Sequence, residues 1–448
     1  MASSQPRLDF PLLARTPLEV DFSGGVLSSD GGLLLLAQLD RRIQLTERVA
    51  ACIHDARLPE RVTHPLLDLI RQRIFQIAAG YEDCIDANRL RSDPALKLAV
   101  GRRPTSDADL ACQSTLSRLE YMVAEAECEA INAVLLTTFL EQPRARVREV
   151  ILDVDTSEDK THGQQEFAEF NAYYGGSCYL PRFLFARVAG EGEEALVHAR
   201  LPDTHAYDAD ELIATLESVV AAIRARWPGV RVVLRADAWF GNPELYAWLE
   251  AARVAYAIAI PANAVLNREA QPLRQQTEAE AAASEEKRAR RFGKFWYQAQ
   301  GWSTAREVVA KVEVTPHTTS VRFVVVEGLT GSARRRYTFY GGRGESENRI
   351  KELKAAIKSD RTSAMDFATN QVRLMLAAVA YVLFQGLRRV ARPTGLAHAQ
   401  VETLRLTLIK IAAQVKETTR RVKVALCSAC PTQELWRRLA RRLAVGVT

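Results

Sequence analysis

The 448-residue sequence lacks an export signal and a membrane-spanning run. Its N-terminus has no basic stretch followed by an apolar one. The longest apolar run, MLAAVAYVLF at residues 375–384, is about half of what a bilayer requires. We therefore expect a cytoplasmic protein with no membrane partner.

Cysteine is scarce: of seven cysteines, only Cys427 and Cys430 form a CxxC pair. A structural zinc site needs a second such pair or suitably spaced histidines, and neither lies nearby. We interpret the cysteines as reduced thiols. Repeats and low-complexity segments are also absent.

The net charge of the whole chain is +6, but most of the chain has no excess of positive charge. From Ala391 onward, however, eleven Lys or Arg residues face three Glu, a net +8, so the preceding 390 residues sum to −2. A basic tail on a nearly neutral body favours nucleic acid as partner, although a solvated basic helix has the same composition.

The hydrophobic pattern divides the chain into five regions. Residues 1–145 show helical spacing and are predicted to be an all-α region. Residues 146–266 give three strands, a helix, a strand, a helix and a strand, the order of a ribonuclease H-like α/β core. Residues 267–339 are predicted to be a β-rich insertion whose last strand is RRYTFY. Residues 340–390 complete the core, and residues 391–448 form the basic C-terminal region.

Acidic residues fall at the ends of two predicted strands. Asp153 and Asp155, two residues apart, project from one face of the first strand, and Asp237 ends the fourth. In the proposed fold these strands are neighbours, and Glu347 arrives from the helix after the insertion. The sequence therefore predicts that three acids converge, although each acid alone could simply be solvated.

Clustered carboxylates need a shared cation, because like charges raise one another's pKa. Oxygen-only ligation suits Mg²⁺, for which Mn²⁺ can substitute. Two such ions about 4 Å apart would support phosphoryl transfer. The pattern thus favours cutting and joining of a nucleic-acid backbone.

The stretch YGGRGESENRIKELK at residues 340–354 carries Tyr340, Arg343, Glu347 and Lys354. A salt-bridged helix face would explain it, since Arg343 and Glu347 are one turn apart, as are Glu347 and Lys351. Alternatively, Glu347 is a metal ligand, Arg343 and Lys354 contact phosphate, and Tyr340 contacts a nucleotide. Gly341 and Gly342, between Tyr340 and Arg343, are predicted to form the turn between a strand and this helix.

Spacing alone does not decide between these interpretations, but a resemblance does. The four residues match the Tyr-x2-Arg-x3-Glu-x6-Lys signature of DDE insertion-sequence transposases without a gap. The stretches DVDTSED, RADAWF, FATNQVRLMLAAVAYVL and GYEDCIDANRLRSDP look like the branch called the thirteen-eighty family of insertion sequences. The resemblance extends over nearly the whole chain.

The resemblance implies catalytic and metal-binding roles for Asp155, Asp237 and Glu347, with Asp153 as an alternative first acid. Asp155 is preferred because Thr156 and Ser157 follow it, as is usual in the family. The predicted DNA contacts are Tyr340, Arg343, Lys351 and Lys354.

The implied activity is cut-and-paste transposition with two Mg²⁺ ions. A homodimer in the prokaryotic nucleoid would act on terminal inverted repeats and target DNA, and the N-terminal helices would recognise the repeats. The alternatives are a metal-dependent nuclease that does not join strands and a catalytically inert DNA-binding regulator.

Two further pairs of side chains are candidates for lining the site. His162 and Gln164 follow the first strand, where a structural role for His162 is the simpler interpretation. Trp239 and Phe240 follow Asp237, and we expect packing rather than DNA contact from them.

Overall fold

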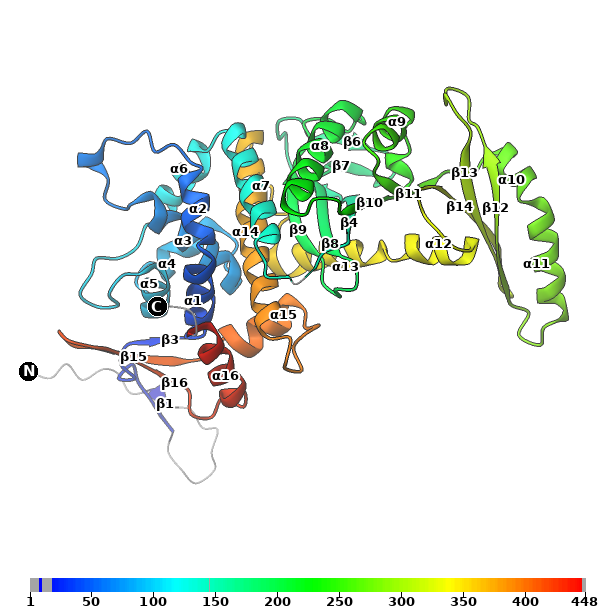
Figure 1. Ribbon diagram of the computed structural model, residues 1–448. Helices are drawn as coiled ribbons and strands as arrows, with labels where there is room; N and C mark the ends of the chain where they lie inside the picture. The colour runs from blue at the N-terminus through cyan, green and yellow to red at the C-terminus, as the bar shows by residue number, and fades with distance from the viewer. Residues whose placement is uncertain (1–7, 10–17, 145, 445–448) are drawn as a thin grey trace, which may run out of the picture. The chain divides into compact units, whose positions relative to one another are not determined.

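The computed structural model describes residues 8–9, 18–144 and 146–444 (Figure 1). The chain divides into two compact units, one formed by residues 1–122 with 383–448 and the other by residues 123–382. The boundary near residue 382 falls within the long helix α14 (Phe367–Val390). The N-terminal and basic C-terminal regions thus belong to one unit.

The second unit is built around an eight-stranded mixed sheet. Its strands are β4 (Glu149–Thr156), β8 (Arg182–Val188), β9 (Ala195–Arg200), β10 (Arg231–Ala236), β11 (Ala255–Ile260), β12 (Ala289–Tyr297), β13 (Arg306–Val314) and β14 (Thr319–Glu327). Their order is β12-β13-β14-β11-β10-β4-β8-β9. β4, β10 and β11 run parallel, and the other neighbouring strands are antiparallel.

The predicted succession of strands and helices from residue 146 to 266 is confirmed for the strands of the main sheet and the helices between them. The predicted strand SCYLPRFLFARV is divided, however, because Gly176–Tyr179 and Arg182–Val188 are separate strands in different sheets. Helices α8 (Ala209–Arg226) and α9 (Pro243–Ala251) stand at the expected places. Each begins at a side-chain cap: Asp208 accepts from the Glu211 N–H, and Asn242 from the Glu244 N–H. The predicted pairing of the first and fourth strands is also confirmed, since β4 lies beside β10.

The two faces of this sheet carry different partners (Figure 1). Alternate residues of β4 and β10, such as Leu152 and Leu234, pack in the main core against α7 (Glu125–Leu140), α8 and α9. On the opposite face, a smaller cluster that includes Val324 and Val326 packs against α12 (Ala333–Gly341). Helix α13 (Gly344–Glu352) follows α12 and contacts β4.

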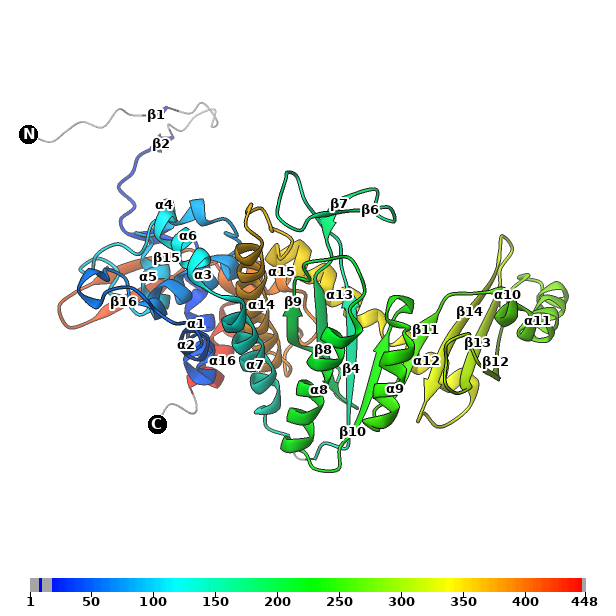
Figure 2. The same ribbon diagram turned by 90° about the horizontal axis from the view of Figure 1, so that it is seen from above.

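The region from residue 267 to 339 extends the main sheet, because β12, β13 and β14 continue it beyond β11 (Figure 2). Helices α10 (Ala264–Glu269) and α11 (Gln271–Ala283) precede these strands. The prediction that RRYTFY is a strand is wrong, since these residues lie in α12 and the third strand is β12. The alternating aromatics misled the prediction: Tyr337 and Tyr340, three residues apart, pack together on the helix with ring centroids 5.8 Å apart.

The predicted strand-to-helix turn at Gly341 and Gly342 is also wrong, because α12 includes Gly341 and the pair joins two helices. Gly342 is needed for a different reason. A Cβ at this position would lie 2.3 Å from Nη1 of Arg235. The helix junction therefore approaches β10 closely.

A small sheet stands beside the carboxyl end of β4. It has the order β5-β7-β6 and consists of β5 (Asp159–Lys160), β6 (Glu169–Asn171) and β7 (Gly176–Tyr179). Figure 2 shows β6 and β7 projecting from the main sheet. On the other side, the π-helix η4 (Leu353–Ile357) prolongs α13 and ends at Lys358, whose φ is 60°. The short 3-10 helix η3 (Ala238–Phe240) follows β10.

The first unit is mainly helical. Its helices are α1 (Leu33–Ile43), α2 (Leu45–Ala51), α3 (Leu66–Ala79), α4 (Ala87–Leu90), α5 (Pro94–Val100), α6 (Gln113–Met122), α15 (Val401–Leu404) and α16 (Gln433–Ala444), with the short helices η1 (Pro59–Arg61), η2 (Cys84–Asp86) and η5 (Arg405–Ile409). Its strands are β1 (Leu8–Asp9), β2 (Glu19–Val20), β3 (Leu27–Ser28), β15 (Ala413–Glu417) and β16 (Val422–Leu426). The N-terminal region is therefore not all helical, because β3 pairs with β15 of the basic region.

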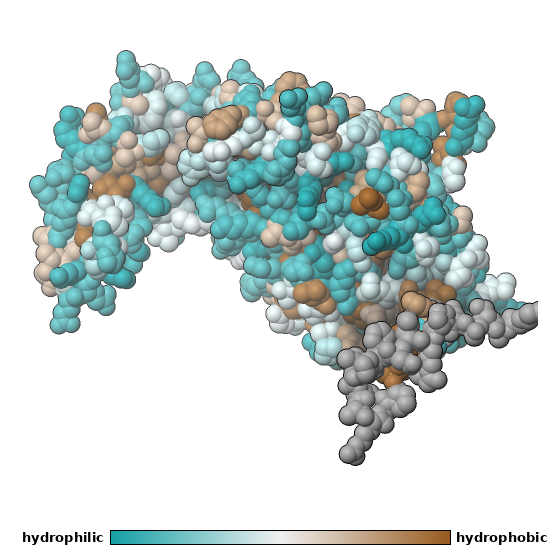
Figure 3. Space-filling model, turned by 180° about the vertical axis from the view of Figure 1, so that it is seen from behind, coloured by the Kyte–Doolittle hydropathy of each residue, from teal (hydrophilic) through white to brown (hydrophobic). Residues whose placement is uncertain are grey.

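Helix α14 is long and apolar enough to cross a membrane by length and composition, with a mean hydropathy of 1.4 over its best window. However, 83% of that window is buried, as is typical of a core helix. On the face shown in Figure 3, hydrophilic residues predominate and hydrophobic ones form small groups.

Candidate active site

Two aspartates lie side by side at the carboxyl ends of parallel strands. In the register of β4 and β10, Val154 pairs with Ala236, so the next residues, Asp155 and Asp237, are neighbours. Both lie on the sheet face opposite the main core, because their preceding residues point into that core. Asp237 also caps η3 by accepting a hydrogen bond from the Trp239 N–H at 3.0 Å.

Helix α13 brings the third acid to the same place. Arg343, at the start of this helix, donates from Nη1 to Asp155 Oδ2 at 2.7 Å and from Nη2 to Glu347 Oε1. The Ser346 hydroxyl on the next turn donates to the Arg343 carbonyl at 2.7 Å and lies 3.3 Å from Asp155 Oδ2. The guanidinium of Arg343 therefore lies between two carboxylates from distant parts of the chain.

These side chains line a cavity of about 700 Å³, here called the acid cavity. Three predicted acids, Asp155, Asp237 and Glu347, line it together with three predicted DNA contacts, Arg343, Lys351 and Lys354. Its remaining lining residues are Thr156, Ser157, Tyr173, Tyr174, Ile350, Ala355, Lys358 and Asp360.

Two acids of this cavity, Asp155 and Asp237, have pKa values above their usual range. Burial, opposed by Arg343 and reinforced by Asp237 and Glu347, raises the pKa of Asp155 to about 6. Burial also raises the pKa of Asp237, although the Trp239 N–H lowers it. Burial tends to lower the pKa of Arg343, but the nearby carboxylates, Asp155 first, raise it above its usual value, so this cation stays charged.

Asp153, the alternative first acid, has a different environment from Asp155. It is fully buried and accepts two hydrogen bonds from Arg235, each at 2.6 Å. Arg235 in turn donates to the Phe339 carbonyl at 2.8 Å, at the end of α12. Asp153 does not line the acid cavity, and its carboxylate is used in holding β4, β10 and α12 together.

The predicted DNA contacts are placed differently from one another. Lys351 is exposed at the acid cavity. Lys354 donates to the Ser157 hydroxyl at 3.2 Å and to the Glu158 carbonyl, so it fixes the chain after β4. Tyr340 is half-buried against Tyr337 and lies outside the lining of the acid cavity.

The structure separates the other candidates from the acid cavity. His162 lines a second cavity, and Gln164 lines neither. Phe240 is 1% exposed in the main core, which confirms a packing role, whereas Trp239 is 49% exposed. None of these four side chains lines the acid cavity.

Sequence reasoning missed Tyr173 and Tyr174. They lie between β6 and β7 and line the acid cavity, with Tyr173 88% exposed. The Tyr-Tyr-Gly-Gly sequence marks a turn, but nothing in the sequence indicates that this turn lies beside the acids.

The oxygen donors of the acid cavity suit a hard divalent cation such as Mg²⁺. Within residues 18–144 and 146–444, however, no three His, Cys, Asp or Glu side chains lie close enough together to hold a metal ion. Arg343 lies between Asp155 and Glu347 and donates a hydrogen bond to each. The donor chemistry therefore fits a divalent cation, and Arg343 compensates the carboxylate charge in this arrangement.

Comparison with known proteins defines the class. The family model described as Transposase DDE domain group 1 matches residues 10–446. The protein therefore belongs to the DDE transposase family, whose members generally use divalent metal ions.

Other comparisons are more distant. A cryo-EM structure of a piggyBac transposase synaptic complex with hairpin DNA is similar with a TM-score of 0.41 and 11% identity, over 80% of this chain and 74% of that chain. No curated protein matches the sequence.

Proposed function

We propose that the protein is a DNA transposase that cleaves DNA at the terminal inverted repeats of an insertion sequence and joins the freed ends to target DNA. The observation that carries this proposal is the acid cavity, where Asp155, Asp237 and Glu347 meet beside exposed cationic side chains. Carboxylates that bind a divalent cation, next to cations that bind phosphate, suit phosphodiester chemistry. Membership of the DDE transposase family supports the same activity.

In this proposal Asp155, Asp237 and Glu347 hold two Mg²⁺ ions, for which Mn²⁺ can substitute. The ions would stabilise charge on the attacking and leaving oxygens. Asp155 is the first acid rather than Asp153, because Asp153 is committed to Arg235. Lys351 would contact phosphate directly, while Lys354 and Tyr340 would position the chain around the cavity.

We further propose that the sheet from β9 to β11 is a ribonuclease H-like core and that residues 267–339 are its insertion. The strand order β9-β8-β4-β10-β11 supports this assignment. The N-terminal region would recognise the inverted repeats, the basic tail would add phosphate contacts, and two protomers would hold two DNA ends. Assignment to the thirteen-eighty family and action at the prokaryotic nucleoid belong to the same proposal.

A matched pair of variants on α13 tests the proposal. Glu347→Gln removes the third acid, whereas Glu345→Gln changes an exposed carboxylate that pairs with Arg349 at 3.6 Å and lies outside the acid cavity. With Mg²⁺ and DNA that carries the flanking repeats, Glu347→Gln should reduce cleavage at least about 10²-fold and keep end binding. Glu345→Gln should cleave like the wild type.

The same assay separates the alternatives. If the wild type binds the ends without cleaving them, the protein is a regulator and the proposal is wrong. If it cleaves without joining strands, it is a nuclease. Unaltered cleavage by Glu347→Gln would refute the assignment of the third acid.

A further inference from the structure

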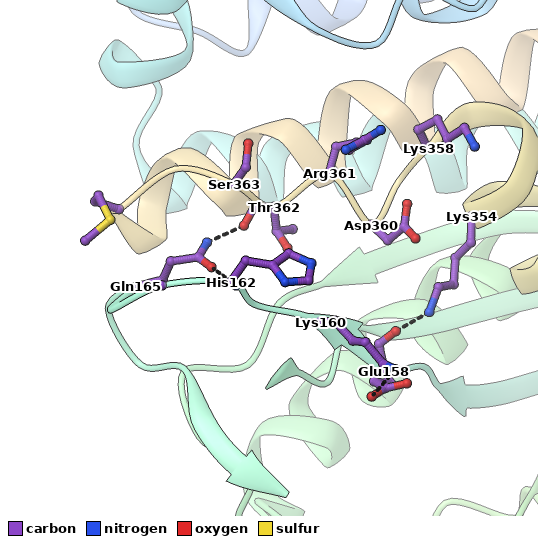
Figure 4. A pocket seen from close by; sticks show the side chains of 12 residues that line it. Glu158, Lys160, His162, Gln165, Lys354, Lys358, Asp360, Arg361, Thr362 and Ser363 are labelled. Atoms are coloured by element: carbon purple, nitrogen blue, oxygen red, sulfur yellow. Dashed lines mark hydrogen bonds and ion pairs between the residues drawn. The ribbon is translucent and has the colours of Figure 1, made fainter. Parts of the chain in front are cut away.

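A second cavity adjoins the acid cavity and has no assigned role (Figure 4). Its volume is about 540 Å³, and it is here called the basic cavity. One wall is the chain after β4, including Lys160 and His162, and the other is the chain between η4 and α14, including Lys358 and Arg361. Both walls belong to the second unit.

Cations outnumber anions in the lining. Lys160, Lys354, Lys358 and Arg361 face only Glu158 and Asp360. Lys160 lies 4.0 Å from Glu158. Lys358 is exposed, and its ammonium has no hydrogen bond or ion pair with any residue that the structure describes. An uncompensated cation at a cavity is suited to an anionic ligand.

The walls are joined by hydrogen bonds at the end of the cavity near Gln165. The buried amide of Gln165 donates to the Ala364 carbonyl at 3.0 Å and to the Thr362 carbonyl. The Glu166 N–H donates to the Met365 carbonyl at 3.0 Å. Because these bonds connect the walls before any ligand binds, the cationic side chains extend from a preformed frame.

The two cavities are continuous in their lining. Lys354, Lys358 and Asp360 line both the acid cavity and the basic cavity. A nucleic-acid strand with one phosphate at the three carboxylates therefore has its neighbouring phosphates within reach of cations on one side. A chain of phosphates fits a row of lysines and arginines better than one isolated anion does.

We propose that the basic cavity binds the phosphodiester backbone of the DNA strand next to the reacting phosphate, with Lys358 as its principal contact and Lys160 and Arg361 beside it. This inference rests on the proposed function, because it assigns a strand of DNA to the acid cavity. It adds a binding site outside the set of acids and the Tyr-Arg-Glu-Lys residues.

Binding measurements test this site without requiring cleavage. The probe is a single-stranded oligothymidylate of about ten nucleotides, a length that one such groove can hold. The variants are Lys358→Gln, Lys358→Arg and the control Lys287→Gln. Lys287 is also exposed, has a similar backbone conformation with φ of 51°, and lines neither cavity.

Lys358→Gln should weaken binding about tenfold, the usual effect of losing a charge-assisted hydrogen bond. It should also reduce the slope of log affinity against log salt by about 0.7, the value for one phosphate contact of a single strand. Lys358→Arg should restore both quantities, and Lys287→Gln should change neither. A methylphosphonate oligothymidylate, which lacks backbone charge, should bind wild type and Lys358→Gln equally weakly.

Equal affinity and equal salt slope for Lys358→Gln and Lys287→Gln would overturn the inference. So would tight binding of thymidine monophosphate at the same site, since the cavity would then hold a free nucleotide. If the wild type binds the oligonucleotide as described but does not cleave element ends, the proposed function fails and the backbone site stands.

Discussion

Two aspartate–arginine pairs lie on one face of β4 and β10, and they differ in almost every physical respect. The inner pair, Asp153 with Arg235, is 0% and 1% exposed and doubly hydrogen-bonded. The outer pair, Asp155 with Arg343, lines the acid cavity, and Arg343 divides its donors between Asp155 and Glu347.

The difference shows that two aspartates of β4, only two residues apart, can have different roles: Asp153 stabilises the fold, and Asp155 faces the acid cavity. The inner carboxylate receives both of its hydrogen bonds from one guanidinium, which also donates to the end of α12 and lies 3.7 Å from the buried Glu194. The outer carboxylate shares its cation and has a pKa raised to about 6, so it remains available to another cation. Substitutions at the inner pair should therefore change stability, and those at the outer pair should change activity.

The largest expected effect is on activity, at the outer pair. Asp155→Asn should reduce cleavage of element ends at least about 10²-fold, because under the proposed function it removes an oxygen that would bind the metal at the reacting phosphate. Its melting temperature at neutral pH should not fall. The pKa of Asp155 in the folded state is above the usual 3.8, so the native state binds more protons than the unfolded state. The contribution of Asp155 to the free energy of unfolding therefore falls as pH rises from about 4 to 6. A protein that melts earlier and still cleaves would contradict this assignment.

The next effect is on stability, at the inner pair. Asp153→Asn should lower the free energy of unfolding by about 3 kcal/mol, because it leaves the buried Arg235 without its carboxylate. Urea unfolding measures this loss. The double variant Asp153→Leu with Arg235→Met should recover part of it, since both charges of the pair are then removed together and only the buried Glu194, 3.7 Å from Arg235, loses a partner. If Asp153→Asn instead abolished cleavage and left stability unchanged, Asp153 would again be a candidate metal ligand.

A smaller effect is expected where the inner pair meets the helix junction. Gly342→Ala places a Cβ 2.3 Å from Arg235 Nη1 and should cost about 1–3 kcal/mol of unfolding free energy. Gly344→Ala is the control, because no atom beyond its chain neighbours and the backbone of its own helix lies within 4 Å of the added Cβ. Equal melting temperatures for the two variants would show that the junction does not need this close approach.

The smallest effect is on pH dependence. Arg343 lowers the pKa of Asp155, so Arg343→Gln should raise it above about 6. Asp155 is then ionised only at higher pH, and the acidic limb of the residual cleavage profile should move up by about one pH unit or less. A limb that stays in place or moves down would show that Asp155 does not control it.

Alternation and helix caps are local signals, and from them the sequence predicted the main strands and helices from residue 146 to 266. The pairing of the first and fourth strands, and with it the expected convergence of three acids, followed from the ribonuclease H-like order of these elements. Alternation alone did not separate Asp153 from Asp155, since both project from the same face, and the preference for Asp155 rested on the family resemblance. In the structure, the register with β10 distinguishes them, because it places Arg235 opposite Asp153. An arginine two residues before Asp237 in the apolar stretch VRVVLRAD was the available signal.

The errors arose where tertiary packing outweighs local pattern. The alternating aromatics of RRYTFY also suit the face of α12, which packs beside Val324 and Val326. Tyr173 reaches the acid cavity only because β6 and β7 fold back beside β4, a contact that no local pattern specifies. The position of Lys358 at the basic cavity likewise depends on tertiary structure, because the chain after β4 and the chain between η4 and α14 form this cavity together.

The central claim is that Asp155, Asp237 and Glu347 bind a divalent cation where DNA is cut. Iron-directed backbone cleavage tests it most directly: the protein bound to element-end DNA is loaded with Fe²⁺ in place of Mg²⁺ and exposed to ascorbate and peroxide. We predict polypeptide cuts near residues 155, 237 and 347 that excess Mg²⁺ suppresses and Asp155→Asn abolishes. Cuts confined to other segments, or cuts at these three sites that persist in Asp155→Asn, would contradict the account.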